Sequence, residues 1–197
     1  GNLFSDPDEG RPEIYVMGLR NPFRFTFDDR TETLYWGEIG PDANEGHPER
    51  GPRGYDEFNR TKEPGFFGWP LFIEHNLPYR PWDMTKGAAT GPFFDPQNPR
   101  NDSPANDGLR ELPPPQPSWI AYPYALDDKF FELGGGDAMG VSRRAGRSAM
   151  SGPVYYTDRY PAETAFPDYY DGKLILYDFM RDWILLAEID DQGEIAK

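Results

Sequence analysis

The chain has 197 residues, 16% of them aromatic, with a formal net charge of -14 and a sequence pI near 4.5. This length suffices for the core of one medium-sized domain, and the aromatic content excludes a disordered chain. An acidic surface repels phosphate groups, so nucleic acids and anionic membranes are poor partners, whereas Ca²⁺ is compatible with it. The chain contains no cysteine, which excludes disulfides, thiolate metal sites and cysteine nucleophiles. No apolar run approaches the roughly 18 residues of a membrane span.

The first sixty residues predict short strands separated by turns. Residues 13–17, 23–27 and 33–38 are rich in aromatic and β-branched residues, and 55–59 is a weaker strand. The second and third pieces should form a hairpin through residues 28–32. Because the 43 Gly and Pro residues (21 + 22) disfavour long helices, we expect an all-β fold. Four antiparallel strands within residues 14–59 fit one blade of a β-propeller, but an ordinary β-sandwich has the same pattern.

Residues 71–117 differ from the rest of the chain. They contain many prolines, including Pro113, Pro114 and Pro115, and little periodicity. We predict a long irregular insertion on the surface of a single partial domain that spans residues 1–197. Its aromatic residues favour a segment that packs down onto the domain.

The last third of the chain again predicts strands. Residues 119–124 and 149–156 have strand character, and 173–179 and 183–190 form a clear hairpin. Between the strands 119–124 and 149–156, the Gly-rich and basic stretch 134–147 predicts a flexible loop. It is not a phosphate-binding loop, because no Lys-Ser/Thr and no helix follow.

Several motifs in this order resemble the soluble glucose/sorbosone dehydrogenase family. They are G-L-R-N-P from Gly18, G-E-I-G-P from Gly37, D-E-F-N from Asp56, G-F-F-G-W-P from Gly65, R-S-A-M-S-G-P from Arg147 and F-P-D-Y-Y-D-G-K from Phe166. The resemblance spans most of the chain apart from 71–117. It implies part of a six-bladed β-propeller that uses pyrroloquinoline quinone (PQQ) and Ca²⁺ to oxidise a sugar or polyol, with a cytochrome as a candidate electron acceptor. It also implies a periplasmic or extracellular location.

The resemblance carries roles onto matching residues. Arg20 and Asn21 stand where the family contacts the quinone, and a guanidinium suits the three carboxylates of that cofactor. The alternative is that Arg20 pairs with an acid such as Glu38 and only holds the turn. Arg181 stands beside the position of a cofactor-contacting lysine, where this chain has Met180.

The metal ligands follow in the same way. The backbone carbonyls of Gly40 and Pro41 match the ligands of the catalytic calcium, and a plain turn is the alternative. Asp56 and Glu57 match an acidic pair at a structural calcium, and a solvated strand edge is the alternative. Trp69 is expected to be structural.

Departures from the family pattern leave other functions open. The catalytic histidine of the family belongs to an earlier blade, and neither His47 nor His75 matches it. Ile39 replaces a polar substrate contact, and Phe67 replaces a tyrosine. A propeller that binds carbohydrate or protein without catalysis is the main alternative. A lactone or ester hydrolase is another, but no convergent set of carboxylate and Asn side chains is evident.

Overall fold

The computed structural model describes residues 1–124, 146–190 and 194–196. Its main sheet has the order β10-β4-β3-β2, formed by β2 (Arg24–Asp28), β3 (Thr33–Glu38), β4 (Tyr55–Thr61) and β10 (Ile120–Pro123). All its pairings are antiparallel. A second antiparallel sheet contains β11 (Ala149–Tyr155), β12 (Lys173–Asp178) and β13 (Trp183–Glu188). The only described helices are the 3-10 turns η3 (Thr157–Arg159) and η4 (Asp168–Tyr170), and neither is long or apolar enough to cross a membrane. The prediction of an all-β fold is confirmed.

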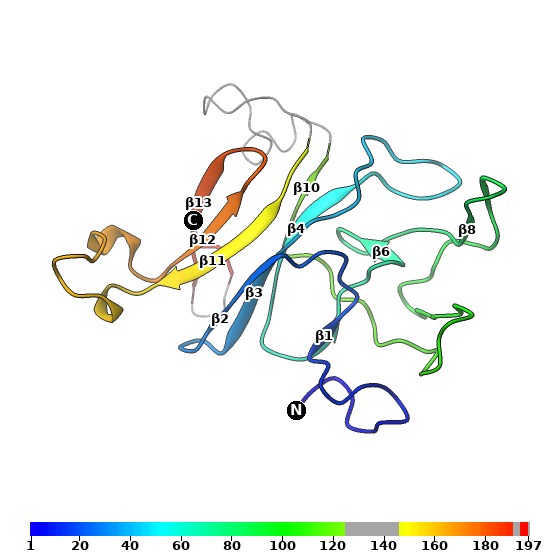
Figure 1. Ribbon diagram of the computed structural model, residues 1–197, viewed down its shortest axis with the longest axis horizontal. Helices are drawn as coiled ribbons and strands as arrows, with labels where there is room; N and C mark the ends of the chain where they lie inside the picture. The colour runs from blue at the N-terminus through cyan, green and yellow to red at the C-terminus, as the bar shows by residue number, and fades with distance from the viewer. Residues whose placement is uncertain (125–145, 191–193, 197) are drawn as a thin grey trace.

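The remaining strands are short pairs outside these two sheets. β1 (Val16–Met17) runs parallel to β5 (Gly65–Phe66). β6 (Phe72–Ile73) pairs with β7 (Leu77–Pro78), and β8 (Trp82–Asp83) pairs with β9 (Ala88–Ala89). In Figure 1 the labelled strands β6 and β8 lie on the right, the β11–β13 sheet lies on the left, and the main sheet lies between them.

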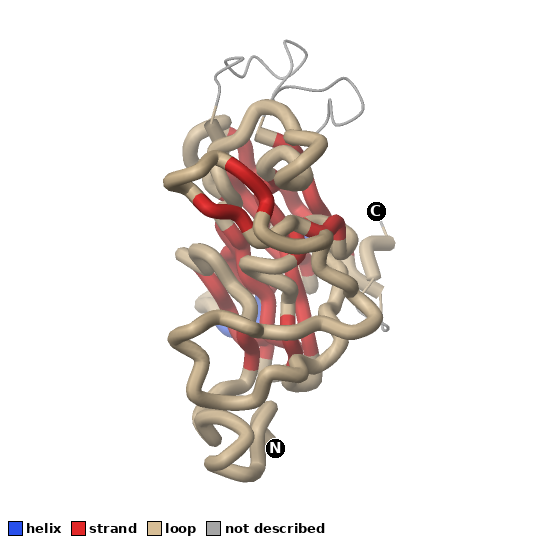
Figure 2. Tube along the Cα trace, turned by 90° about the vertical axis from the view of Figure 1, so that its right-hand side faces the viewer, coloured by secondary structure: helices blue, strands red, loops and turns tan. Residues whose placement is uncertain are grey.

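The main sheet is a middle layer, covered on both faces. One face packs against β11–β13 through a core of Tyr35, Phe58, Tyr122, Leu174, Leu176 and Trp183. On the other face Trp36 meets Phe67 edge to face at 4.6 Å, beside a second cluster of Phe66, Leu71 and Phe72. Figure 2 shows the loops on this side lying over the strands. Because both faces are covered, β3 does not alternate between apolar and polar residues.

The prediction for the first blade was wrong in one strand. Residues 13–17 do not join the main sheet, because Val16 and Met17 pair with Gly65 and Phe66 instead. The fourth strand is β10, which pairs with β4 from Ile120 to Pro123. The several small antiparallel sheets are compatible with part of a propeller. That residues 1–197 form one partial propeller domain stays a prediction.

The proline-rich segment 71–117 packs against the main sheet, as its aromatic residues predicted. Leu71, Phe72 and Ile73 are buried, and Phe94 packs partly buried against the Phe72 cluster. Most of the predicted loop at 134–147 lies outside the described residues, but Arg147 is described.

Gly37 sets the distance between the two sheets. A Cβ at this position would collide with the backbone carbonyl of Ala149 on β11. Gly37→Ala is therefore expected to push β11 away and to lower the free energy of unfolding by about 2 kcal/mol or more. Urea unfolding monitored by tryptophan fluorescence measures this change. Gly1→Ala is the control, because a Cβ at this position meets no atom within 4 Å. Gly87 is equally open, but its φ of +61 would strain an alanine.

Candidate functional site

The Arg20–Asn21 turn is bound to the end of β3 by a buried carboxylate. Glu38 Oε1 accepts hydrogen bonds from the backbone N–H groups of Arg20 and Asn21, the latter at 2.6 Å. Ile39 N donates to Asn21 O at 3.2 Å, and Arg20 Nη1 donates to Ile39 O at 2.8 Å. The turn therefore lies directly beside residues 39–41, so the structure brings these two predicted motifs together.

Both side chains at the tip of this turn are exposed. The Arg20 guanidinium lies 6.0 Å from the ring centroid of Trp69, and no carboxylate of the described residues is within ion-pair distance of it. Glu38 holds the turn through the backbone of the turn, but the ion pair between the Arg20 side chain and Glu38 that the alternative required is not formed. The guanidinium of Arg20 thus remains able to take an external anion.

Glu38 itself is in an unusual state for a carboxyl group. Burial raises its pKa to about 7, although the hydrogen bonds from Asn21 and Arg20 act in the opposite direction. Its second oxygen, Oε2, is buried and has no partner within the described part of the chain. Near neutral pH this oxygen can therefore carry a proton.

The Gly40–Pro41 turn is held by a buried ion pair. Arg147 Nε lies 2.7 Å from Asp56 Oδ1, with both side chains fully buried, and Gly40 N donates to the same oxygen at 2.8 Å. Asp56 Oδ2 accepts from Ala149 N at 2.8 Å. Arg147 Nη2 also donates to the carbonyl of Pro41 at 2.8 Å, and this carbonyl accepts a second bond from Ala43 N at 2.9 Å.

Asp56 and Glu57 face opposite sides of the main sheet, as adjacent residues of a strand must. Asp56 faces β11, whereas Glu57 faces the covering segment, where its oxygens accept bonds from Glu74 N at 2.6 Å and Asn59 Nδ2 at 3.1 Å. Burial raises the pKa of Asp56 to about 6 and that of Glu57 to about 8. The alternative of a solvated strand edge is wrong, since both residues are buried.

The predicted calcium ligands do not fit a metal ion in this arrangement. Asp56 and Glu57 diverge, and the oxygens of Asp56 and Pro41 already accept hydrogen bonds. Among the described residues, no group of three or more His, Cys, Asp or Glu is placed to hold a metal. At the Gly40–Pro41 turn, the positive charge that balances Asp56 comes from Arg147.

Arg181 is buried, unlike Arg20 and Asn21. It is 1% exposed, and its guanidinium donates to the carbonyls of Gly146, Pro123 and Tyr124 at 3.1, 2.8 and 3.1 Å. These bonds fix the end of β10 and the segment just before β11, and this geometry does not favour the predicted contact with a cofactor.

Beside the two turns lies an apolar hollow of about 480 Å³ between the two sheets, lined by Phe23, Arg24, Ile39, Ser148, Met150, Tyr177 and Phe179. Ile39, which separates the two turns in sequence, contributes to its wall. A planar ligand bound by Arg20 would meet a mostly apolar wall on this side.

Two anchors of the site were not predicted as such. Glu38 was considered only as an ion-pair partner, and Arg147 only as part of a basic loop. Glu38 could have been found from its place just before the Gly40–Pro41 turn. Arg147 could not, because it lies 106 residues from Pro41 in sequence.

Comparison with known families agrees with the four motifs between Gly18 and Pro70, whereas the motifs from Arg147 and Phe166 lie outside the matched residues. A family model described as Glucose / Sorbosone dehydrogenase matches residues 1–109, which include both turns and most of the segment 71–117. No curated protein and no solved structure matches the chain significantly. Since the match covers more than half of the 197 residues, the chain belongs to the glucose/sorbosone dehydrogenase family.

Proposed function

We propose that this chain provides one wall of a quinone site in a sugar or polyol dehydrogenase. The observation that carries the proposal is the Arg20–Asn21 turn, whose backbone is fixed by the buried Glu38 while its two side chains stay exposed. The family is generally PQQ-dependent, and PQQ carries carboxylates that a guanidinium binds through paired hydrogen bonds.

When bound, the quinone supplies an acceptor for the hydride of a substrate C–OH group. The residues of this chain would bind the quinone and orient it and the substrate. Arg20 would hold a carboxylate, the Asn21 amide would hydrogen-bond a carbonyl or hydroxyl oxygen, and the apolar hollow beside Ile39 would exclude water. The base that takes the substrate hydroxyl proton is not assigned to any residue of this chain.

No step is assigned to calcium. At the carbonyl of Pro41 a calcium ion would have to compete with the hydrogen bonds from Arg147 Nη2 and Ala43 N. The predicted roles of Gly40, Pro41, Asp56 and Glu57 as metal ligands, and of Arg181 as a cofactor contact, are therefore left out of the proposed site.

Titration with PQQ, followed by the absorbance of the quinone, tests the site without any need for turnover. Wild-type protein is expected to bind at micromolar concentration, and Arg20→Met is expected to bind about tenfold more weakly or worse, because an ionic hydrogen-bond partner is lost. Arg11→Met removes an exposed arginine elsewhere and serves as the matched control. Absence of micromolar binding, or equal binding by Arg20→Met, would contradict the proposal.

A non-catalytic propeller is the second candidate, favoured by the burial of Arg181 and by Ile39 at a position that is polar in the family. Binding of PQQ by the wild type would argue against it. The cytochrome acceptor and the periplasmic or extracellular location belong to the first proposal.

A further inference from the structure

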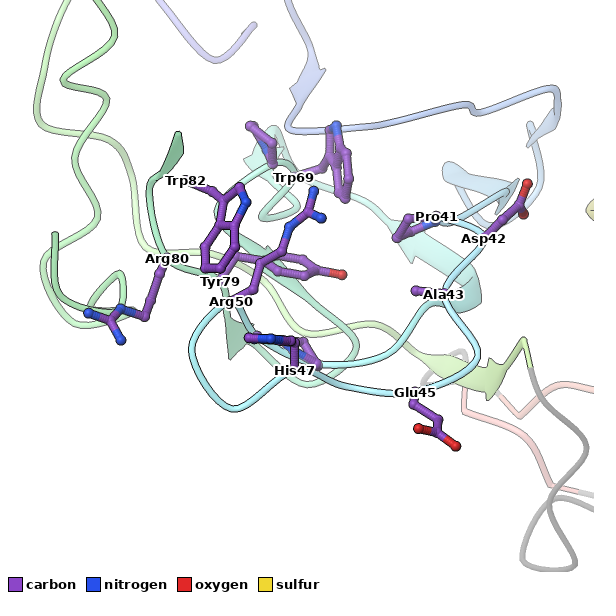
Figure 3. Close-up of a pocket in the computed structure, with 13 residues that line it drawn as sticks. Pro41, Asp42, Ala43, Glu45, His47, Arg50, Trp69, Tyr79, Arg80 and Trp82 are labelled. Atoms are coloured by element: carbon purple, nitrogen blue, oxygen red, sulfur yellow. The ribbon is translucent and has the colours of Figure 1, made fainter. Parts of the chain in front are cut away.

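A second cavity, of about 440 Å³, has Pro41 and Trp69 among its lining residues and shares no lining residue with the apolar hollow. Its walls come from the 41–54 connection between β3 and β4 and from residues 69–82. Figure 3 shows these two segments facing each other across the cavity. The volume falls within the range of small-ligand sites.

Aromatic rings form much of the wall. Trp69 and Tyr79 meet edge to face at 6.0 Å, and His47 meets Trp82 in the same way at 5.5 Å. The ring of Tyr79 lines the cavity, while its hydroxyl is buried and has no hydrogen-bond partner among the described residues. Flat rings next to polar groups suit a ligand with apolar C–H faces and many hydroxyls.

Arg50 is one of two arginines that line the cavity, together with the acidic residues Asp42 and Glu45. Its guanidinium lies 5.7 Å from the Trp82 ring centroid. Within the described part of the chain, the guanidinium makes one hydrogen bond, in which Nη2 donates to Met84 Sδ at 3.8 Å. In Figure 3 it points toward Trp69, whereas the carboxylates of Asp42 and Glu45 point away from it.

The neighbouring arginine shows the contrast. Arg80 also lines the cavity, but it donates to Glu49 Oε2 at 2.6 Å and to the carbonyl of Gly91 at 2.9 Å, and in Figure 3 it points away. Although Asp42 and Glu45 also line the cavity, no carboxylate of the described residues forms an ion pair with Arg50, and a guanidinium without such a partner favours an anionic ligand.

We propose that this cavity binds a sugar that carries a carboxylate, such as a uronic acid unit. A C–H face of the pyranose ring packs against Trp82 or Trp69, the carboxylate pairs with Arg50, and a hydroxyl reaches His47. This site does not require Arg20 or a quinone.

Isothermal titration of the full chain with digalacturonate, maltose and glucose 6-phosphate tests the proposal. Digalacturonate is expected to bind about tenfold more tightly than maltose, and Arg50→Gln is expected to remove this preference. Trp82→Ala is expected to weaken both, and Trp82→Phe to restore most of the binding. Arg11→Gln, with the same loss of charge outside the cavity, is the control.

Three results would overturn the proposal: no binding of digalacturonate at millimolar concentration, equal binding by Arg50→Gln and wild type, or tighter binding of glucose 6-phosphate, which would indicate a phosphate site. The PQQ titration separates this site from the first. Arg50→Gln should bind PQQ as the wild type does, and Arg20→Met should bind digalacturonate as the wild type does. Displacement of digalacturonate by PQQ would also contradict the assignment.

Discussion

Arg147→Met is expected to lower the free energy of unfolding by about 3 to 5 kcal/mol. The change leaves the buried carboxylate of Asp56 without the one cationic partner that the described residues give it, and it removes a donor from the carbonyl of Pro41. Burial lowers the pKa of Arg147, and the negative charge of Asp56 acts in the opposite direction. The attraction between the two side chains therefore compensates part of the cost of removing the guanidinium from water. Guanidinium or urea unfolding at pH 7 measures the loss.

A double variant separates two causes of the expected loss of stability: the unpaired charge of Asp56 and the lost packing of the Arg147 side chain. Adding Asp56→Asn to Arg147→Met removes the uncompensated charge, so the double variant should be more stable than Arg147→Met alone. Arg11→Met is the control for loss of an exposed arginine. A loss below about 1 kcal/mol in Arg147→Met would show that the pair does not hold the turn.

Glu57→Gln is expected to change how stability depends on pH. Because burial raises the pKa of Glu57 to about 8, the folded protein holds this proton more tightly than the unfolded chain. The resulting stabilisation is present below the pKa of the unfolded chain and is lost as pH rises through about 8. Glu38 and Asp56, whose pKa values are raised to about 7 and about 6, act in the same direction.

The wild type should therefore lose stability from pH 5 to pH 9. Glu57→Gln should be close to the wild type at pH 5 and more stable by about 3 kcal/mol at pH 9. The side-chain N–H of the amide that Glu57→Gln introduces can donate to Asn59 Oδ1 if the Asn59 amide rotates, because this oxygen has no other partner among the described residues. Chemical unfolding at both pH values, with the exposed Glu63→Gln as control, checks this. An unchanged pH dependence in Glu57→Gln would rule out the assignment.

Local pairings could be predicted from sequence, and distant ones could not. The hairpins β2–β3 and β12–β13 follow from strand patterns that flank short turns, and both were predicted. The parallel pairing of Val16 with Gly65 and the antiparallel pairing of β10 with β4 join residues far apart in the chain. No local pattern specifies such partners, so residues 13–17 were assigned to the wrong sheet.

The same limit applies to the site. The Arg20–Asn21 and Gly40–Pro41 turns could be placed side by side because both lie close to the ends of β2 and β3. That Asp56 and Glu57 diverge follows from strand geometry alone and could have been predicted. The burial of Arg181 and the pairing of Arg147 with Asp56 depend on how the second sheet packs, which no nearby residue indicates.

The separation of β10 from β4 by residues 62–119 also bears on the order of folding. Closing so long a connection costs entropy before any contact forms, although this cost grows only with the logarithm of its length. The locally connected strands β2, β3 and β4 can assemble first, and β10 can add to their edge only after the intervening chain has collapsed. Until then, the hydrogen-bonding groups along β4 would be open to strands of other molecules, so the risk of aggregation during refolding is greatest at this edge.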